Sequence, residues 1–157
     1  MKIIIDTREQ NPFDFSRCGC ETGRGTLHTG DYSIAGFENV VAVERKTLTD
    51  LIGCLTDGRE RFEAELARMR EFESCAVVVE SPFRNLAKGK YRSGMNPFAA
   101  VQSILSMTQK FRMPFLFAES RVQAEFLTYH FLRHFDKHHQ GKPTRSACFP
   151  VPAYGRG

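Results

Sequence analysis

Two carboxylates and a lysine within residues 31–46 have the types and the spacing needed for metal-dependent hydrolysis. Asp31 lies in the stretch TGDYSIAG, and Glu44 and Lys46 lie in VAVERKTLTD. In a strand, side chains two residues apart share a face, so Glu44 and Lys46 point the same way and Arg45 points the other way. Carboxylate oxygens bind hard divalent cations such as Mg²⁺, and a bound cation polarises a phosphate and activates water. A nearby ammonium can stabilise the charge that develops on the phosphate, so these residues predict a site for phosphodiester hydrolysis.

The same residues also have a purely structural interpretation. Glu44 and Lys46 could form an exposed ion pair beyond the end of the strand, and such a pair contributes only about 0–1 kcal/mol to stability. The catalytic interpretation requires more, because the carboxyl groups of Asp31 and Glu44 must lie on the same side of one sheet.

The composition indicates one globular domain. The chain has 157 residues, 41% of them hydrophobic, and its 22 Lys and Arg against 18 Asp and Glu give a formal charge of +4. This excess permits nucleic-acid binding without requiring it. The opening MKIIIDTREQ becomes charged too soon for a signal peptide, and no apolar run reaches the roughly 18 residues of a membrane helix, so we expect a cytoplasmic protein with no membrane partner. The five cysteines have no disulfide or zinc-ligand spacing, which indicates reduced thiols.

Strands and helices alternate along the chain and would position these residues. KIIID predicts a strand that ends at Asp6, and residues 26–46 predict a hairpin whose arms carry Asp31 and Glu44. Elsewhere we expect a Gly-rich turn at 18–27, a helix from Thr47 or Thr49 to Asp57-Gly58, an amphipathic helix at 59–72, a buried strand at 75–81, a mobile basic loop at 82–95, a helix at 96–111, a strand at 113–120 and a last helix at 120–139. This order predicts an α/β fold with a mixed central sheet flanked by helices, formed by residues 1–140 and followed by a flexible tail at 141–157.

A longer match adds to this interpretation. GDY at 30–32 followed by VERKTLTDL at 43–51 resembles the GD…ERKxxxD signature of the XPF-type structure-specific DNA endonucleases. IIIDTREQ at 3–10 is similar to the opening strand and D-x-RE element of that family, and DLIGCLTDGR at 50–59 is similar to the segment after its signature. The resemblance covers roughly residues 2–135 and implies a restriction-endonuclease-like core.

The resemblance also implies roles for individual residues. Asp31 and Glu44, with the main-chain carbonyl of Arg45, would bind Mg²⁺ or Mn²⁺, and Lys46 would be the catalytic lysine. Asp6 would reach the metal or its waters. The supporting residues would be Arg8, Glu9, Arg45 and Asp50, with Arg8 on a phosphate and Asp50 bracing Lys46 or Arg45.

Each supporting residue has an alternative structural role. Arg8 and Glu9 could be a surface pair in a loop. Asp50 could be placed at the start of a helix for its dipole, or it could form an ion pair with Arg45 on the other face of the strand.

The resemblance implies an endonuclease that cuts branched, flapped or forked DNA, and a compact form of this kind is typical of bacteria or phage. The alternatives are a non-catalytic DNA-binding or scaffold subunit, and a sequence-specific restriction enzyme. Because Asp31, Glu44 and Lys46 are all present, the sequence favours the catalytic interpretation. Family members usually carry a tandem helix-hairpin-helix module, which is not visible in these 157 residues.

Family members also pair through their nuclease domains, so we expect a homodimer or a heterodimer. The last predicted helix carries more apolar side chains than one buried stripe needs, which fits either a core helix or an interface. These side chains are Phe126, Leu127, Tyr129, Phe131, Leu132 and Phe135.

Overall fold

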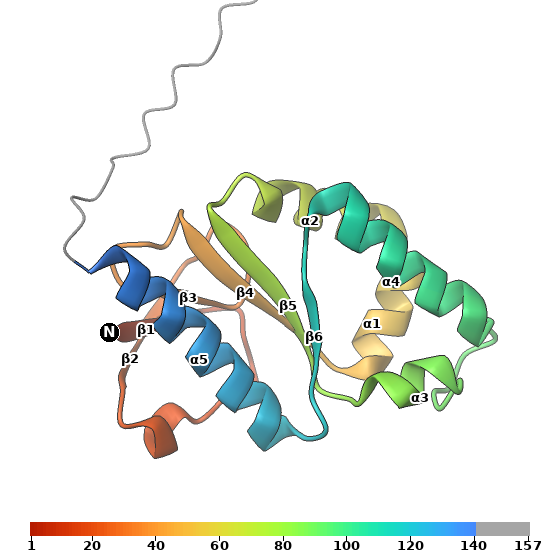
Figure 1. Ribbon diagram of the computed structural model, residues 1–157, viewed down its shortest axis with the longest axis horizontal. Coiled ribbons are helices and arrows are strands. Elements are labelled where there is room, and N and C mark those ends of the chain that lie inside the picture. The colour runs from red at the N-terminus through yellow and green to blue at the C-terminus, as the bar shows by residue number, and fades with distance from the viewer. Residues whose placement is uncertain (141–157) are drawn as a thin grey trace, which may run out of the picture.

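The computed structural model of the chain describes residues 1–140, and these fold into a six-stranded sheet covered by helices (Figure 1). The strands are β1 (Lys2–Asp6), β2 (Glu21–Gly25), β3 (Tyr32–Ile34), β4 (Val41–Lys46), β5 (Ser74–Val79) and β6 (Phe115–Phe117). Their order in the sheet is β2-β1-β3-β4-β5-β6. β3 runs antiparallel to β1 and β4, and the other neighbours are parallel. The predicted α/β fold with a mixed sheet is confirmed.

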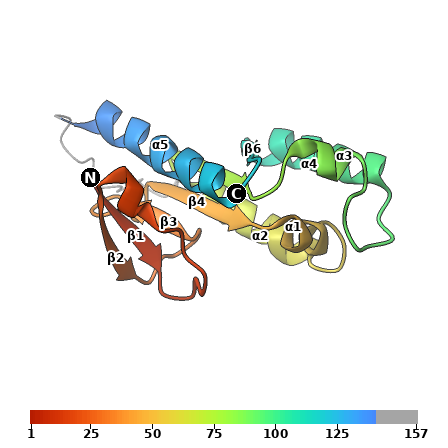
Figure 2. The ribbon, with the colours of Figure 1, turned by 90° about the horizontal axis from the view of Figure 1, so that it is seen from below.

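Helices lie on both faces of the sheet (Figure 2). They are α1 (Leu48–Leu55), α2 (Arg59–Arg70), α3 (Phe83–Ala87), α4 (Pro97–Phe111) and α5 (Arg121–His139), with a 3₁₀ helix at Phe15–Cys18. One core cluster joins β5 to α1, α2 and α4, and a second cluster joins β1, β3 and β4 to α5. No helix within residues 1–140 has the length and apolar character needed to cross a membrane.

Successive side chains of β5 point to opposite faces of the sheet and belong to different core clusters. Val77 and Val79 belong to the cluster with α1 and α2, whereas Val78 belongs to the cluster with α5. Glu44 is in register with Val77, and Lys46 with Val79. Because neighbours in register share a face, the side chains of Glu44 and Lys46 lie on the α1–α2 side of the sheet.

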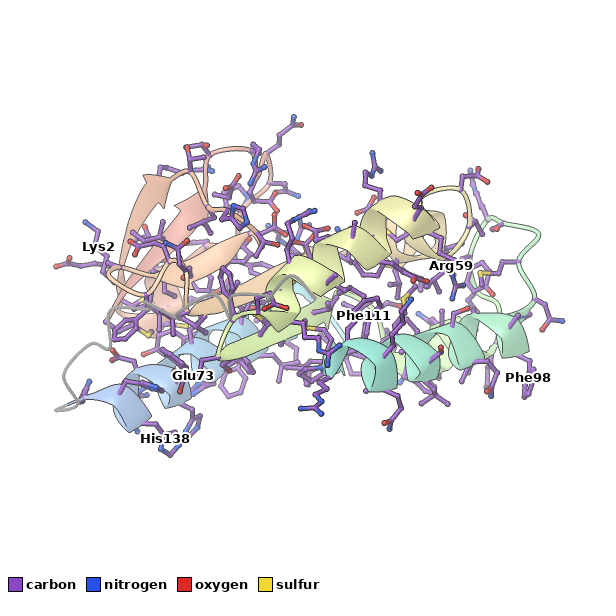
Figure 3. All side chains as sticks on the ribbon, turned by 90° about the horizontal axis from the view of Figure 1, so that it is seen from above. Lys2, Arg59, Glu73, Phe98, Phe111 and His138 are labelled. Carbon is purple, nitrogen blue, oxygen red and sulfur yellow. The ribbon has the colours of Figure 1, made fainter. Side chains whose placement is uncertain are left out.

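The connection from β4 to the helices is short and well capped. Thr47 and Asp50 form a reciprocal capping box at the start of α1, as the sequence predicts for a helix that begins beside Thr47. A side chain at Gly58 would place its Cβ 3.0 Å from the carbonyl oxygen of Gly53, so glycine allows α2 to begin directly after α1. α2 then lies alongside α4 (Figure 3), and Arg59 donates to the Ser103 hydroxyl at 3.1 Å.

Three predictions about the elements were wrong. Residues 21–25 form the edge strand β2, not a turn. The strand could not be predicted because its sequence, ETGRG, has two glycines and no alternation of apolar residues. The hairpin was placed too long, since residues 26–31 are a loop before the three-residue strand β3. The segment 82–95 is not a plain loop, because it contains α3 and the Tyr91 hydroxyl donates to the Met95 carbonyl.

Four of the five cysteines lie within the described residues. Cys18, Cys20, Cys54 and Cys75 are all free. The fifth cysteine and the predicted tail at 141–157 lie outside the residues that the structure describes.

Candidate active site

A cavity of about 350 Å³ is lined by residues at the end of β1, just before β3, at the end of β4 and on α2. Every residue that the sequence predicted for the site lines this cavity: Asp6, Arg8, Glu9, Asp31, Glu44, Arg45, Lys46 and Asp50. The cavity is also lined by Gln10, His28, Thr29, Gly30, Glu65 and Arg68.

Asp31 and Glu44 converge, as the catalytic interpretation requires. Tyr32 on β3 pairs with Val43 on β4, and both of these side chains face the α5 core. The next residues along the two strands are Asp31 and Glu44, which therefore face the opposite side, into the cavity. Asp31 also accepts a hydrogen bond from the Arg45 main-chain N–H at 2.8 Å, which fixes its carboxylate beside β4.

The glycine before Asp31 makes this approach possible. Gly30 has φ of 78°, and a Cβ built there would lie 2.9 Å from the Cβ of Ala42. A side chain would therefore be strained by its backbone conformation and would also push the loop away from β4. The GD pair is thus needed to bring Asp31 to Arg45.

The two acids share an environment that disfavours their charge. Burial raises the pKa of Asp31 to about 6, and the charge of Glu9 adds to this rise. Burial also raises the pKa of Glu44 well above its usual range, and the neighbouring charge of Asp31 adds to the rise. Two buried carboxylates that repel each other form a site that a cation would stabilise.

Lys46 is the ammonium of the site. Its Nζ contacts Glu44 Oε1, lies 3.9 Å from Glu65 Oε2, and lies 5.4 Å from the centre of the Phe62 ring. Burial alone would lower the pKa of Lys46, but the charge of Glu44 outweighs burial and raises it. Lys46 is therefore charged at neutral pH and held over the cavity, and the alternative of an exposed surface pair is wrong, because both side chains are largely buried.

The ERCC4 domain family model matches residues 5–131 of the chain. The chain belongs to this family. The ERCC4 domain is similar to the solved structure of XPF from Aeropyrum pernix, with a TM-score of 0.71 and 19% identity over 89% of this chain and 67% of that chain. XPF from the same organism in complex with DNA matches with a TM-score of 0.69 and 20% identity over 87% of this chain and 66% of that chain. The fold is thus that of the XPF-family nuclease domain, and the resemblance seen in the sequence is confirmed.

A curated relative is much longer. A putative ATP-dependent RNA helicase of Methanocaldococcus jannaschii is 28% identical over 120 residues, which are 76% of this chain and 14% of the relative. The ERCC4 domain therefore spans only a small part of that protein.

The side chain of Arg45 points away from those of Glu44 and Lys46, as strand alternation predicts. Its guanidinium contacts Glu80 and lies 3.3 Å from Glu9 Oε2, and Glu80 also accepts from Arg121 at 2.9 Å. This network ties the end of β4 to the end of β5 and the start of α5. The predicted alternative of an Arg45–Asp50 ion pair is wrong, because Arg45 pairs with Glu9 and Glu80 while Asp50 accepts from the Thr47 hydroxyl.

Asp6 holds the loop of the ERCC4 domain through both of its carboxylate oxygens. Its carboxylate accepts from the Arg8 main-chain N–H at 2.8 Å, from the Arg8 guanidinium at 2.7 and 3.1 Å, and from the Leu27 N–H at 2.7 Å. Burial would raise the pKa of Asp6, but these hydrogen bonds lower it. Asp6 therefore anchors the loop that delivers Asp31, and its contact with the metal or its waters stays a prediction.

Arg8 and Glu9 do not pair with each other. Arg8 binds Asp6 and the Leu27 carbonyl while its side chain stays 68% exposed, so its remaining N–H groups can reach a phosphate. Glu9 is buried against Arg45 and accepts from the Asn11 N–H at 2.7 Å. The alternative of a surface pair in a loop is wrong for both residues.

Asp50 has the structural role that the helix start suggested. Its carboxylate accepts from the Thr47 hydroxyl at 2.6 Å within the capping box. Among residues 1–140, Asp50 forms no hydrogen bond or ion pair with the Lys46 or Arg45 side chain, so it supports the site by fixing the start of α1 directly after β4.

Two acids of the site were missed in the sequence. Glu65 of α2 lines the cavity, and Glu80 holds Arg45. Glu65 lies at the edge of the apolar stripe of α2, three residues after Phe62, and Glu80 directly follows a buried parallel strand beside β4. Both positions indicate a polar group turned toward the site, but only once β4, β5 and α2 are known to be neighbours.

The oxygen atoms that line the cavity fit a divalent cation that is bound by few protein ligands. Within residues 1–140, no three His, Cys, Asp or Glu side chains are arranged to hold an ion by themselves. The N–H of Arg45 points to Asp31, and in a regular strand the carbonyl of the same residue points to the same side. Thr29 also lines the cavity, and its buried hydroxyl has no hydrogen-bond partner among the described residues. Two carboxylates, one carbonyl and waters match the set that Mg²⁺ uses.

The raised carboxylate pKa values predict an unusual pH dependence of stability. Because the folded state binds the Asp31 proton more tightly than the unfolded state, stability falls as pH rises from about 4 through about 6. We expect the thermal midpoint of the metal-free protein, followed by circular dichroism, to be higher at pH 5.5 than at pH 7.5. The Asp31→Asn variant should show a smaller difference, because Asp31 no longer titrates while burial still raises the pKa of Glu44. A wild-type midpoint that instead rises toward pH 7.5 would contradict the assignment.

Proposed function

We propose that this ERCC4 domain is an endonuclease that hydrolyses DNA phosphodiester bonds with Mg²⁺ or Mn²⁺. The observation that carries the proposal is the convergence of Asp31, Glu44 and Lys46 on one cavity, with the two carboxylates buried and their pKa values raised. Such a cluster is unfavourable without a cation, so it has a chemical purpose that a structural ion pair would not explain.

Asp31, Glu44 and the Arg45 carbonyl would hold the metal. When bound, the ion polarises the phosphodiester and lowers the pKa of the attacking water. Lys46 holds its ammonium beside Glu44, where it can stabilise the charge that develops on the phosphate. Arg8 and Arg68 line the same cavity and are exposed, so they can bind the neighbouring phosphates and position the strand.

The proposed substrate is branched, flapped or forked DNA. XPF from Aeropyrum pernix has been solved in complex with DNA, and its domain shares this fold. The test is a cleavage assay on a panel of labelled flap, fork, nicked and linear duplexes, with and without Mg²⁺. We expect Mg²⁺-dependent cuts near the junctions.

Two results of this assay would overturn the proposal. Binding of DNA without cleavage of any substrate would instead indicate a non-catalytic subunit. Equal cleavage of linear and branched DNA would remove the structural specificity. Phosphate contacts make binding salt-dependent, so the panel should be run at one fixed ionic strength.

We also propose that the domain forms a dimer through α5 and the neighbouring edge of the sheet. Leu132 and Phe135 are buried in the α5 core, so they do not contribute to this surface. Val122 and Phe126, four residues apart on α5, are 53% and 54% exposed. β6 is an edge strand of the sheet, and an uncovered edge favours pairing with another chain.

The dimer predicts a single-residue switch. Phe126→Glu should convert the protein to a monomer, because a charge would be buried against the partner. Light scattering after size exclusion measures the mass. Lys137→Glu, exposed further along the same helix, is the matched control and should leave the dimer intact. A wild-type chain that stays monomeric at high concentration would refute the interface.

A further inference from the structure

Glu65 is the acid of the cavity to which no role has yet been assigned. It lies on α2 beside Phe62, Leu66 and Met69, which are buried in the core. Its own side chain is only 24% exposed and lines the cavity with Asp31 and Glu44. Most glutamates on the outer face of a helix are free in water, so a glutamate turned into an acidic cavity needs an explanation.

Lys46 lies between two carboxylates from different elements. Its ammonium contacts Glu44, two residues before it on β4, and lies 3.9 Å from Glu65 Oε2 on α2. The Phe62 ring, one turn before Glu65, lies below the ammonium at 5.4 Å and limits where it can move. A small displacement along this surface would bring Lys46 from Glu44 to Glu65.

The charges in the cavity leave Lys46 as the shared cation. Asp6 is paired with Arg8, and Glu9 is paired with Arg45. Asp50 bonds to Thr47, and Arg68 is exposed at the side of the cavity. Among the buried groups, the carboxylates of Asp31, Glu44 and Glu65 have the one ammonium of Lys46, and the buried Thr29 hydroxyl, which has no partner within residues 1–140, lines the same space. A divalent cation would balance this excess of negative charge.

A cation at Asp31 and Glu44 changes the surroundings of Lys46. Like charges repel, and the cation competes with the ammonium for the oxygens of Glu44. Glu65 is then the carboxylate that stays within reach of the ammonium. We propose that Glu65 is a positioning residue: when the cation binds, the Lys46 ammonium leaves Glu44 and pairs with Glu65. This inference rests on the proposed function.

This role separates Glu65 from its neighbour on the same helix. Glu63 pairs with Arg59 at 3.0 Å and with Lys110 at 2.6 Å, and it does not line the cavity. Glu65→Gln and Glu63→Gln therefore remove the same charge from the same helix, one inside the site and one outside it.

The first measurement needs no DNA. Mg²⁺ alone is titrated into the wild-type protein and each variant, and the heat of binding gives the affinity. Without Glu65, Lys46 stays on Glu44 and competes with the cation, so Glu65→Gln should weaken Mg²⁺ binding by about tenfold or more, the usual cost of losing a partner behind a metal ligand. Glu63→Gln should bind Mg²⁺ like the wild type.

The second measurement separates positioning from a general loss of charge. At saturating Mg²⁺, Glu65→Gln should lower kcat by about tenfold with KM for DNA unchanged, and Glu65→Asp should recover most of it. In a Lys46→Met background the same change should cost little, because the two residues act as one unit. Thermal midpoints should confirm that all variants fold.

The outcomes are distinct. Wild-type protein that neither binds Mg²⁺ nor cleaves DNA would overturn the proposed function and this inference together. An active wild type with a Glu65→Gln variant that binds Mg²⁺ and cleaves normally would overturn this inference alone. An equal cost of Glu65→Gln with and without Lys46 would also overturn it.

Discussion

Asp31→Asn and Glu44→Gln are each expected to abolish Mg²⁺-dependent DNA cleavage while leaving DNA binding within a few-fold of the wild type. Each change keeps the shape of the side chain but removes a charged metal ligand. Loss of a ligand removes several kcal/mol of stabilisation from the transition state, so the rate should fall by about 10³-fold or more. Cleavage of a labelled flap and binding to it by fluorescence anisotropy measure the two effects separately.

The same variants carry an internal control for folding. Because burial raises the pKa of Asp31 to about 6, a neutral amide at residue 31 should not destabilise the metal-free protein at pH 7.5, and its oxygen can still accept from the Arg45 N–H. An inactive variant with an unchanged or higher thermal midpoint has therefore lost chemistry and not its fold. Retained cleavage in either variant would contradict the assignment of the ligands.

Lys46→Met is expected to have the second largest effect on cleavage. Methionine keeps an unbranched side chain of similar length near the Phe62 ring but removes the ammonium that would lie beside the phosphate. The loss of one such charge costs about 10²–10³-fold in kcat. Single-turnover cleavage at saturating Mg²⁺ measures it.

The metal affinity of the Lys46→Met variant distinguishes the two roles in the site. Since the ammonium competes with a cation for Glu44, its removal should leave Mg²⁺ binding intact or make it tighter. A variant that cleaves at the wild-type rate, or one that no longer binds Mg²⁺, would show that Lys46 does not act on the phosphate.

The geometry of the central pair could be predicted from the sequence because it depends on local rules. Adjacent strands and the period of two place Asp31, Glu44 and Lys46 on one face and Arg45 on the other. The two faces of β4 consequently have different tasks. One face carries the charged groups of the cavity, and the other is locked to Glu80 and Glu9 by Arg45.

The rest of the site depends on contacts between segments far apart in the chain. Glu65 reaches Lys46 only because α2 packs beside β4, and Arg121 reaches Glu80 across 41 residues. The hydrogen bonds of Asp6 with the Leu27 N–H and Arg8 could not be predicted, because only the folded loop brings these groups to its oxygens. Strand β2 was missed because ETGRG has no apolar alternation, and its place beside β1 is set by backbone pairing.

The most direct test of the account is the position of a divalent cation in a crystal soaked in Mn²⁺, found from its anomalous scattering. We predict one peak between the carboxyl groups of Asp31 and Glu44, with its metal–oxygen distances close to about 2.2 Å and the Arg45 carbonyl as a further ligand. A crystal in which Mn²⁺ binds elsewhere, or in which these two carboxyl groups stay free of metal at saturating Mn²⁺, would contradict it.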